Sequence, residues 1–466
     1  MQHDNSWREL MAALRAQAAG LAPGDRLPST RDLVRTHHVS PVTVSRALAV
    51  LAAEGAVVTR PGSGTYVAHR RPTARVFPDT SWQTVTLGER EVETGDLLEL
   101  FSPPPAGVIP LSGGYLHTSL QPVRALATAL ARAGRRPEAW ERPPIAGIPD
   151  LREWFLRSIG GTALAAEAMI TSGGQSALVT AFRAIAPPGA PVLVEAPTYP
   201  GALAAARLAG LRAVPVPVDA AGVRPDLLAE AFAVTGARLF YCQPTFHNPT
   251  GAVLAAQRRQ RAVEVARAAG AFVVEDDFAR WLDLERTAPP PLAAEDPDGT
   301  IVHVASLTKI CAPSLRVGAV VGHGPVMERL CAARFVEDFF VSRALQGAAL
   351  ELVSAPAWAR HVRTVRSALR ERRDAMIEAV RRHLPDTGPV AAPAGGMHVW
   401  LQLPAGHDER ELAARARAAG VLVSPGRSFF AAEPSGPFIR LTYAAASCGE
   451  LEEGVRRLGT LLGPRR

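Results

Sequence analysis

Lysine is almost missing from this chain of 466 residues: Lys309 is the only one, although lysine and arginine together number 51. Arginine can replace the charge of a lysine, but its guanidinium stays protonated, whereas a desolvated amine can lose its proton and attack a carbonyl carbon. The one retained amine is therefore a candidate Schiff-base lysine. A single lysine, taken alone, is more simply a surface residue left by chance, so its neighbours in the sequence decide between the two interpretations.

The chain is also poor in features that define several other protein classes. Its four cysteines, Cys242, Cys311, Cys331 and Cys448, form no C-x-x-C pair, which argues against a disulfide framework and against a zinc site. The first residues lack the basic stretch and apolar core of a secretion signal, and no apolar run is long enough to span a membrane. We therefore expect a cytoplasmic protein with neither a bound metal nor a membrane contact.

The composition that remains is that of an ordinary globular protein of two to four domains, with 47% apolar and 20% charged residues. The net charge of +7 is compatible with a polyanionic partner such as nucleic acid, although an arginine-rich composition alone gives the same value.

The first seventy residues predict short helices. Apolar residues recur at helical spacing over residues 7–14. Ser29 is suited to cap a short helix over 31–35, and Ser40 and Pro41 are suited to open a further helix that carries an apolar stripe. Two short helices joined by a tight turn predict a helix-turn-helix.

A hairpin follows these helices, with strands over 57–60 and 65–67. Together with the runs GDRLPSTR at 24–31, VSPVTVSRAL at 39–48 and RPGSGT at 60–65, it resembles the winged helix-turn-helix of GntR-type transcription regulators. The resemblance implies double-stranded DNA as a partner, with the start of the second helix in the major groove. The residues expected to reach DNA are Arg31, Ser40, Thr43, Ser45, Arg46, Gly62, Ser63 and Gly64. Most helix arginines are simply solvated, and family members often have an arginine in place of Pro41.

Beyond this run the sequence predicts a linker and then a large α/β domain. Residues 70–107 show no sustained periodicity and include a proline run, so we interpret them as a linker with some local structure over 77–100. Apolar runs then alternate with alanine-rich helical stretches such as 255–269, which is typical of a mostly parallel sheet covered by helices. The predicted strands are 190–195, 238–242, 271–275 and 300–305. The expected domains are 1–69, which binds DNA, the linker 70–107, and 108–466.

Three polar motifs follow predicted strands at their carboxyl ends, where open parallel sheets bind ligands. They begin at Asn248, Asp276 and Ser306, and the third ends at Lys309. An amine, a carboxylate and an amide that converge suit pyridoxal phosphate (PLP). The amine forms a Schiff base with the aldehyde, the carboxylate favours the protonated pyridine ring, and the amide reaches the phenolic oxygen. The run SGGQS at 172–176 opens a helix, whose N-terminal amides suit the phosphate.

From Val108 onward the chain resembles fold-type I PLP enzymes of the aspartate aminotransferase class, including their small C-terminal α+β domain, matched by GGMHVW at 395–400 and VSPG at 423–426. The resemblance implies that Lys309 is the catalytic residue and that it forms the internal aldimine with PLP. It places the cofactor contacts at Gly174, Gln175, Tyr199, Asn248, Asp276, Ser306, Thr308 and Arg316, and the substrate carboxylate on Arg440.

The sequence departs from this class at two positions. Phe278 stands where the class has a tyrosine that donates to the phenolic oxygen, and a phenyl ring cannot donate that bond. Arg142 stands where the class has a tyrosine that reaches the phosphate across a dimer; an arginine can meet a phosphate, but through a different contact.

A GntR-type domain joined to an aminotransferase-like domain is the layout of the MocR subfamily of transcription regulators. This resemblance implies a head-to-tail homodimer that binds DNA and senses PLP or an amino compound. The alternative is a working aminotransferase with an accessory DNA-binding domain, because Lys309, Asp276, Asn248 and Arg440 are all present. We favour the regulator, since Phe278 removes one hydrogen bond that tunes the cofactor.

Overall fold

The computed structural model describes residues 3–60, 63–68, 79–87, 97–98, 102–160, 167–388 and 390–463. It divides the chain into two compact units, Met1–Arg90 and Glu91–Arg466, which we call the head and the body. Gly62 and most of the predicted linker lie outside the described residues, and the domain boundaries at 69 and 107 stay predictions. No helix in the described ranges is both long and apolar enough to cross a bilayer.

The head consists of helices around one small core, a two-stranded hairpin and a further short helix. The second and third helices begin where serine caps were predicted: Ser29 Oγ accepts from the backbone amide of Asp32, and Ser40 Oγ accepts from that of Thr43. Apolar side chains from the first three helices, among them Leu14 and Val44, fill the core. The elements are α1 (His3–Ala19), α2 (Thr30–His37), α3 (Pro41–Ala53), β1 (Val57–Arg60), β2 (Gly64–Val67) and α4 (Ser81–Leu87).

The body is built on an eight-stranded sheet in the order β4-β11-β10-β9-β8-β5-β6-β7. The five strands from β10 to β6 in this order run parallel to one another, whereas β11 pairs antiparallel with both of its neighbours. The strands are β4 (Glu167–Thr171), β5 (Pro191–Ala196), β6 (Arg212–Asp219), β7 (Gly222–Val223), β8 (Leu239–Cys242), β9 (Phe272–Asp276), β10 (Ile301–Ser306) and β11 (Gly318–Gly322).

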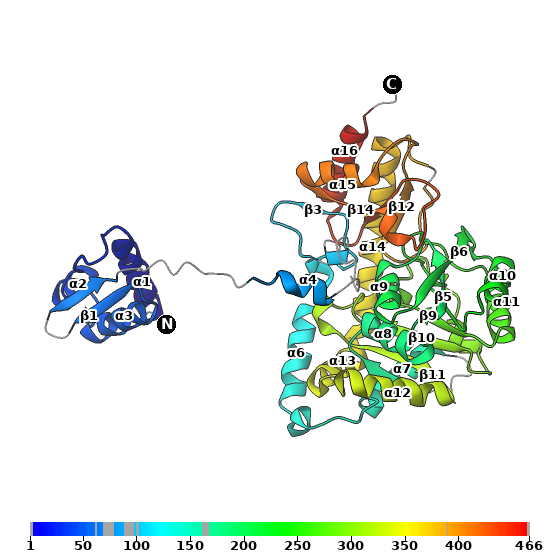
Figure 1. Ribbon diagram of the computed structural model, residues 1–466, viewed down its shortest axis with the longest axis horizontal. Helices are drawn as coiled ribbons and strands as arrows, with labels where there is room; N and C mark the ends of the chain where they lie inside the picture. Colours follow the sequence, from blue (N-terminus) through cyan, green and yellow to red (C-terminus); the bar gives the residue numbers. More distant parts are fainter. Residues whose placement is uncertain are drawn as a thin grey trace. The chain divides into compact units, whose positions relative to one another are not determined.

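Both faces of this sheet are buried under helices. Successive side chains of a strand point to opposite faces, so each strand contributes to the apolar clusters on both sides. In β8, Leu239 and Tyr241 join the apolar cluster under α8 and α9, while Phe240 and Cys242 join the cluster under α10 and α11. Figure 1 shows these helices grouped around the strands. The covering helices are α7 (Pro149–Ile159), α8 (Gly174–Ile185), α9 (Pro200–Leu208), α10 (Pro225–Thr235), α11 (Ala256–Ala268), α12 (Pro325–Asp338) and α13 (Arg343–Ser354), and α6 (Val123–Gly134) packs against α13.

The long helix α14 (Ala357–His383) leads from the sheet to a smaller α+β part of the body (Figure 1). There it packs against α16 (Cys448–Leu462). A three-stranded antiparallel sheet in the order β12-β15-β14 forms the centre of this part. The strands of this sheet are β12 (His398–Gln402), β14 (Ser424–Pro425) and β15 (Phe438–Thr442), and the other elements of this part are β3 (Ile109–Pro110), α15 (Glu409–Ala418) and β13 (Val421–Leu422).

The fold class expected from the sequence is confirmed. Each of the four predicted strands and the helix predicted over 255–269 lies within one residue of its expected bounds at either end. The carboxyl ends of β9 and β10 come side by side because the two strands are parallel neighbours, in which Val304 pairs with Asp276. The sheet thereby brings together the motifs that the sequence placed at strand ends.

Candidate cofactor and ligand site

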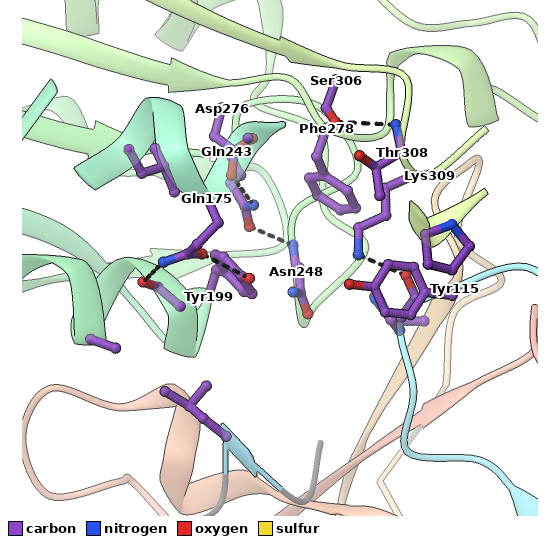
Figure 2. Close-up of a pocket in the computed structure, with 18 of the residues that line it drawn as sticks. Tyr115, Gln175, Tyr199, Gln243, Asn248, Asp276, Phe278, Ser306, Thr308 and Lys309 are labelled. Atoms are coloured by element: carbon purple, nitrogen blue, oxygen red, sulfur yellow. Dashed lines mark hydrogen bonds between the residues drawn. The ribbon is translucent and has the colours of Figure 1, made fainter. Parts of the chain in front are cut away.

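A cavity of about 480 Å³ lies at the carboxyl ends of the sheet strands. It is bounded by loops that follow β4, β5, β8, β9 and β10 and by residues of the smaller α+β part. Each residue predicted to bind the cofactor, and the arginine predicted to bind a substrate carboxylate, lines it. They are Gly174, Gln175, Tyr199, Asn248, Asp276, Ser306, Thr308, Lys309, Arg316 and Arg440. Figure 2 shows how several of these side chains converge.

Lys309 projects into this cavity from the turn after β10 (Figure 2). Its Nζ donates to the carbonyl oxygen of Gly114 at 2.8 Å and lies 4.1 Å from the ring centroid of Tyr115. Burial, with a further contribution from the positive charge of Arg440, lowers the pKa of Lys309 to about 7, while Asp276 opposes this shift. A large fraction of the amine is therefore unprotonated at neutral pH, which is what a nucleophilic lysine requires.

The first turn of α8 and the residues around Lys309 form an anion-binding corner. The N-cap of α8 is Gly173, with φ of 86°, and no side chain caps the helix amides. Arg316 donates from Nη2 to Ser172 O at 2.7 Å, and a Cβ on Gly173 would come within 3.0 Å of its guanidinium. Thr308 Oγ1 is buried and has no hydrogen-bond partner within the described residues. Free helix amides, an unsatisfied hydroxyl and a fixed cation fit a phosphate group.

Asp276 also lines the cavity, at the end of β9. Its Oδ2 accepts hydrogen bonds from the Tyr241 hydroxyl and from Gln243 Nε2, both at 2.8 Å. Burial raises the pKa of Asp276, and the two donors and the charge of Lys309 partly offset that rise. A buried carboxyl held in this way suits a protonated ring nitrogen, which would supply the missing opposite charge.

Asn248 and Arg440 are joined to each other and to the same network. Asn248 N donates to Gln243 Oε1 at 3.1 Å, and Arg440 Nη1 donates to Asn248 Oδ1 at 3.0 Å. Arg440 Nη2 donates to the carbonyl oxygen of Ser112, while Arg440 Nε is buried without a partner in the described chain. Burial lowers the pKa of Arg440 to about 9, but the group remains cationic at neutral pH.

Tyr199 is held over the cavity by Gln175. The Tyr199 hydroxyl donates to Gln175 Oε1 at 3.1 Å, and Gln175 Nε2 donates to Gly201 O at 2.8 Å. A Cβ on Gly201 would lie 2.3 Å from the Tyr199 ring, so glycine leaves the space that this ring needs. The side chain of Gln175 thus positions the ring, while its backbone amide belongs to the first turn of α8.

Sequence reasoning missed several residues that line this cavity or support its walls. Tyr241 and Gln243 hold Asp276, and Tyr115, Leu97 and His398 contribute to its walls. Gln243 directly follows the predicted strand 238–242, so its place at a strand end was a usable signal. Tyr115 and His398 carry no such signal, because only the fold brings them to Lys309.

The two departures from the aminotransferase pattern occupy different places in the body. Phe278 lines the cavity, packs against Phe246 and is turned toward Lys309 and Asn248 (Figure 2). Arg142 lies outside this cavity, on a separate hollow that Arg136 and Arg343 also line.

The head presents its predicted DNA-binding residues mainly on its surface. Arg31, Ser40, Ser45, Arg46 and Ser63 are exposed, and Thr43 is half-buried, with its hydroxyl 2.8 Å from Ser40 Oγ. The guanidinium of Arg46 lies 5.6 Å from the ring centroid of Trp7. In the hairpin, Gly64 has φ of 121°.

Sequence reasoning missed Arg26 in the head. Its Nε lies 2.8 Å from where a Cβ on Gly64 would sit, so this glycine allows the arginine to lie against the hairpin. Arg26 is exposed beside a predicted backbone contact of the wing.

Comparisons with known protein families agree with this geometry. The family described as aminotransferase class I and II matches residues 107–458, and the gntR family of bacterial regulatory proteins matches residues 8–67. An uncharacterized HTH-type transcriptional regulator of Escherichia coli (strain K12), YdcR, is 30% identical over 98% of this chain and 99% of its own length.

Two comparisons concern the body alone. The 2-aminoadipate transaminase of Thermus thermophilus is 33% identical over 79% of this chain and 92% of the relative. The crystal structure of LysN, an alpha-aminoadipate aminotransferase from Thermus thermophilus complexed with N-(5'-phosphopyridoxyl)-L-leucine, superposes with a TM-score of 0.76. It is 32% identical and covers 82% of this chain and 98% of that chain.

Proposed function

We propose a function on the premise that this chain belongs to the class I and II aminotransferase family and, with its GntR-type head, to the MocR subfamily of regulators. The protein is a PLP-dependent transcription regulator. Its head binds double-stranded DNA, and its body binds PLP and senses either PLP itself or an amino compound.

One observation carries this proposal: a buried amine, a buried carboxyl and a phosphate-type corner share one cavity in a chain that also has a DNA-binding head. The relative YdcR, which is named a regulator, matches both parts over nearly its whole length. A transaminase such as that of Thermus thermophilus matches the body only. The combination therefore supports regulation better than metabolism.

The residues of the cavity fit PLP. Lys309 would bind its aldehyde carbon, Asp276 its ring nitrogen, and the α8 amides with Thr308 and Arg316 its phosphate. When bound, PLP supplies an aldehyde that captures amines and a ring that withdraws electrons. The protein supplies a lysine that is partly unprotonated at neutral pH, a carboxyl aligned by Tyr241 and Gln243, and a largely buried site.

Regulation requires that the ligand bind two conformations of the protein unequally. Lys309 and Asp276 belong to the large sheet, whereas Arg440 lies on β15 of the smaller part. A ligand that engages both Lys309 and Arg440 therefore favours whichever arrangement of the two parts lets it reach both. In the head-to-tail homodimer that we propose, such a change alters how two heads are presented to DNA.

A working aminotransferase is the second candidate, favoured by one specific observation. Lys309, Asp276, Asn248 and Arg440 line one cavity, which is the set that transamination needs. In that case the free amine of Lys309 would move a proton at the substrate α-carbon. Phe278, turned into the same cavity without a hydroxyl, argues against efficient turnover.

One experiment separates the two candidates. The purified protein is mixed with its own upstream DNA, with and without PLP and a panel of amino acids, and DNA affinity is measured together with transfer of the amino group to a keto acid. A regulator retains the DNA, and its affinity changes with PLP or one amino compound. Sustained turnover without DNA retention would assign the protein to the enzymes.

A further inference from the structure

His398 is a polar residue of the cavity to which neither the fold nor the proposed cofactor gives a role. It begins β12, where it pairs with Thr442 of β15, while Arg440 pairs with Trp400. Because strand side chains alternate, His398 and Arg440 lie on the same face of this small sheet and both line the cavity. His398 is buried, and its Nδ1 has no hydrogen-bond partner within the described residues.

The imidazole also converges with Lys309. The position of a Cβ on Gly114 would lie 3.5 Å from Lys309 Nζ, 3.8 Å from His398 Cε1 and 3.9 Å from His398 Nε2. The amine, the imidazole edge and the empty face of a glycine thus border one small space. A ligand whose amine reaches Lys309 therefore also lies close to the His398 ring.

The charge state of His398 limits what it does there. Burial and the positive charges of Arg440 and Lys309 lower its pKa well below the usual 6.5. The ring is therefore neutral at pH 7, a weak base and an unsuitable general acid. A neutral imidazole still carries one N–H donor, which can bind an anion without adding a third buried positive charge.

An anion bound at Arg440 can also accept a hydrogen bond from a second residue. Its Nη1 and Nη2 donate to Asn248 Oδ1 and to the carbonyl oxygen of Ser112, so that only Nε has no partner in the described part of the chain. A carboxylate has two oxygens and gains most from two donors. A second donor on the same sheet face completes the site.

We propose that His398 and Arg440 together bind the carboxylate of the ligand, with His398 donating an imidazole N–H, and that this pair selects amino acids over simple amines. This inference rests on the proposed function, since it requires that the cavity take an amino compound. His398 is a specificity-determining residue in this scheme, because it touches the ligand and leaves capture of PLP to Lys309.

A buried histidine is more often a satisfied core residue, but two observations oppose that interpretation here. Its ring nitrogen Nδ1 is unsatisfied within the described residues, and an unpaired buried polar atom destabilises the fold unless a partner arrives. Its ring also borders a cavity, whereas Met397 and Val399, on either side of it, are packed into the apolar core.

The test compares an amino acid with its decarboxylated analogue on the PLP-loaded full chain. L-leucine and 3-methylbutylamine differ only in the carboxylate, and each is titrated by the change in cofactor absorbance. The wild type is expected to bind leucine more tightly. His398→Phe keeps an aromatic ring without the donor, so it should weaken leucine binding about tenfold and leave the amine unchanged. His398→Asn, which retains a donor, should recover part of the loss.

Gln402→Ala, at the exposed end of β12, is the matched control and should change neither affinity. The DNA affinity and cofactor absorbance of each variant report whether it is folded. Equal weakening of both ligands in His398→Phe would show a structural role and overturn the inference, as would unchanged binding of leucine. If the wild type binds neither compound, the amino-compound part of the proposed function fails first, and the carboxylate pair fails with it.

Discussion

Arg440 Nη1 donates a hydrogen bond to Asn248 Oδ1 at 3.0 Å, so the cation expected to hold a ligand carboxylate is tied directly to the amide expected to hold the cofactor ring. Arg440 lies on β15 of the smaller part, whereas Asn248 follows β8 of the large sheet. A ligand that draws Arg440 toward its carboxylate therefore acts on Asn248 as well. In the proposed function, this contact would couple the binding of an amino compound directly to the cofactor.

Removal of the unique lysine should abolish covalent capture of PLP. Lys309→Ala is expected to lose the visible absorbance of the loaded protein, because no other side-chain amine exists in the chain. Borohydride reduction followed by peptide mass spectrometry should find a pyridoxyl adduct at position 309 of the wild type and none in the variant. An adduct-free wild type would refute the cofactor assignment.

The reaction of the cofactor-free protein with PLP should depend on pH with a midpoint near 7. The lowered pKa of Lys309, about 7, leaves the amine protonated below this pH and nucleophilic above it, so the rate rises with pH and then levels off. Stopped-flow absorbance measures this rate. Arg440→Met should move the midpoint upward, because Arg440 lowers the lysine pKa, and Asp276→Asn should move it downward, because Asp276 raises it. Shifts in the same direction in both variants would contradict this electrostatic account.

The hydroxyl of Tyr241 should matter for cofactor affinity although it lies behind Asp276. Tyr241→Phe removes the 2.8 Å bond to Asp276 Oδ2, which lets the pKa of that carboxyl rise further and disfavours its charged form. We expect the Kd for PLP to rise about tenfold, which corresponds to the lower end of the free energy of one hydrogen bond to a charged group. Tyr443→Phe, which removes a buried hydroxyl bonded to Gly395 O, is the control and should leave this Kd unchanged.

Arg46 should contribute to DNA binding through its charge. Arg46→Ala is expected to weaken binding about tenfold and, if the contact is to a phosphate, to reduce the salt dependence by about one ion. Arg15→Ala is a matched control in the same head, because Arg15 already pairs with Glu54 at 2.6 Å. Fluorescence anisotropy at several salt concentrations distinguishes them. Both variants should keep the cofactor absorbance; its loss in Arg46→Ala would contradict independent head and body functions.

Phe278→Tyr should make the protein a better aminotransferase. The ring points toward Lys309 and Asn248 (Figure 2), so a hydroxyl at its tip would supply the donor that the aminotransferase pattern contains. We expect amino-group transfer to a keto acid to rise several-fold while DNA affinity stays the same. A coupled assay on wild type and variant measures this, with Phe246→Tyr, in the same apolar cluster, as the control. No gain would mean that Phe278 is not what limits turnover.

The sequence alone predicted the fold class and the cofactor constellation because both depend on local patterns. Apolar runs with bounded lengths identify buried strands, and a polar residue directly after such a run lies at a strand end. Asp276 and Ser306 follow this rule, and the parallel pairing of β9 and β10 then places the motifs that begin there side by side. The two serine caps in the head were equally local.

Other parts of the site depend on contacts between distant segments. Gly114 and Tyr115 meet Lys309 across nearly two hundred residues, and His398 reaches it from another sheet. A single tyrosine or histidine in the sequence gives no sign of such a contact. The bond between Arg440 and Asn248 was likewise out of reach, since both residues were expected to contact ligands and not each other.

Because Lys309 is the only lysine of the chain and lines the cavity, its chemical reactivity reports whether the cavity is occupied. An amine-selective acylating reagent at neutral pH has one side-chain amine to modify, and we expect that amine to be protected when a small molecule fills the space beside Gly114. The fraction of the peptide around position 309 that carries the acyl group therefore measures the fraction of protein molecules with an empty cavity, without any engineered label. Read across a series of metabolites, that fraction would reveal which of them the protein recognises.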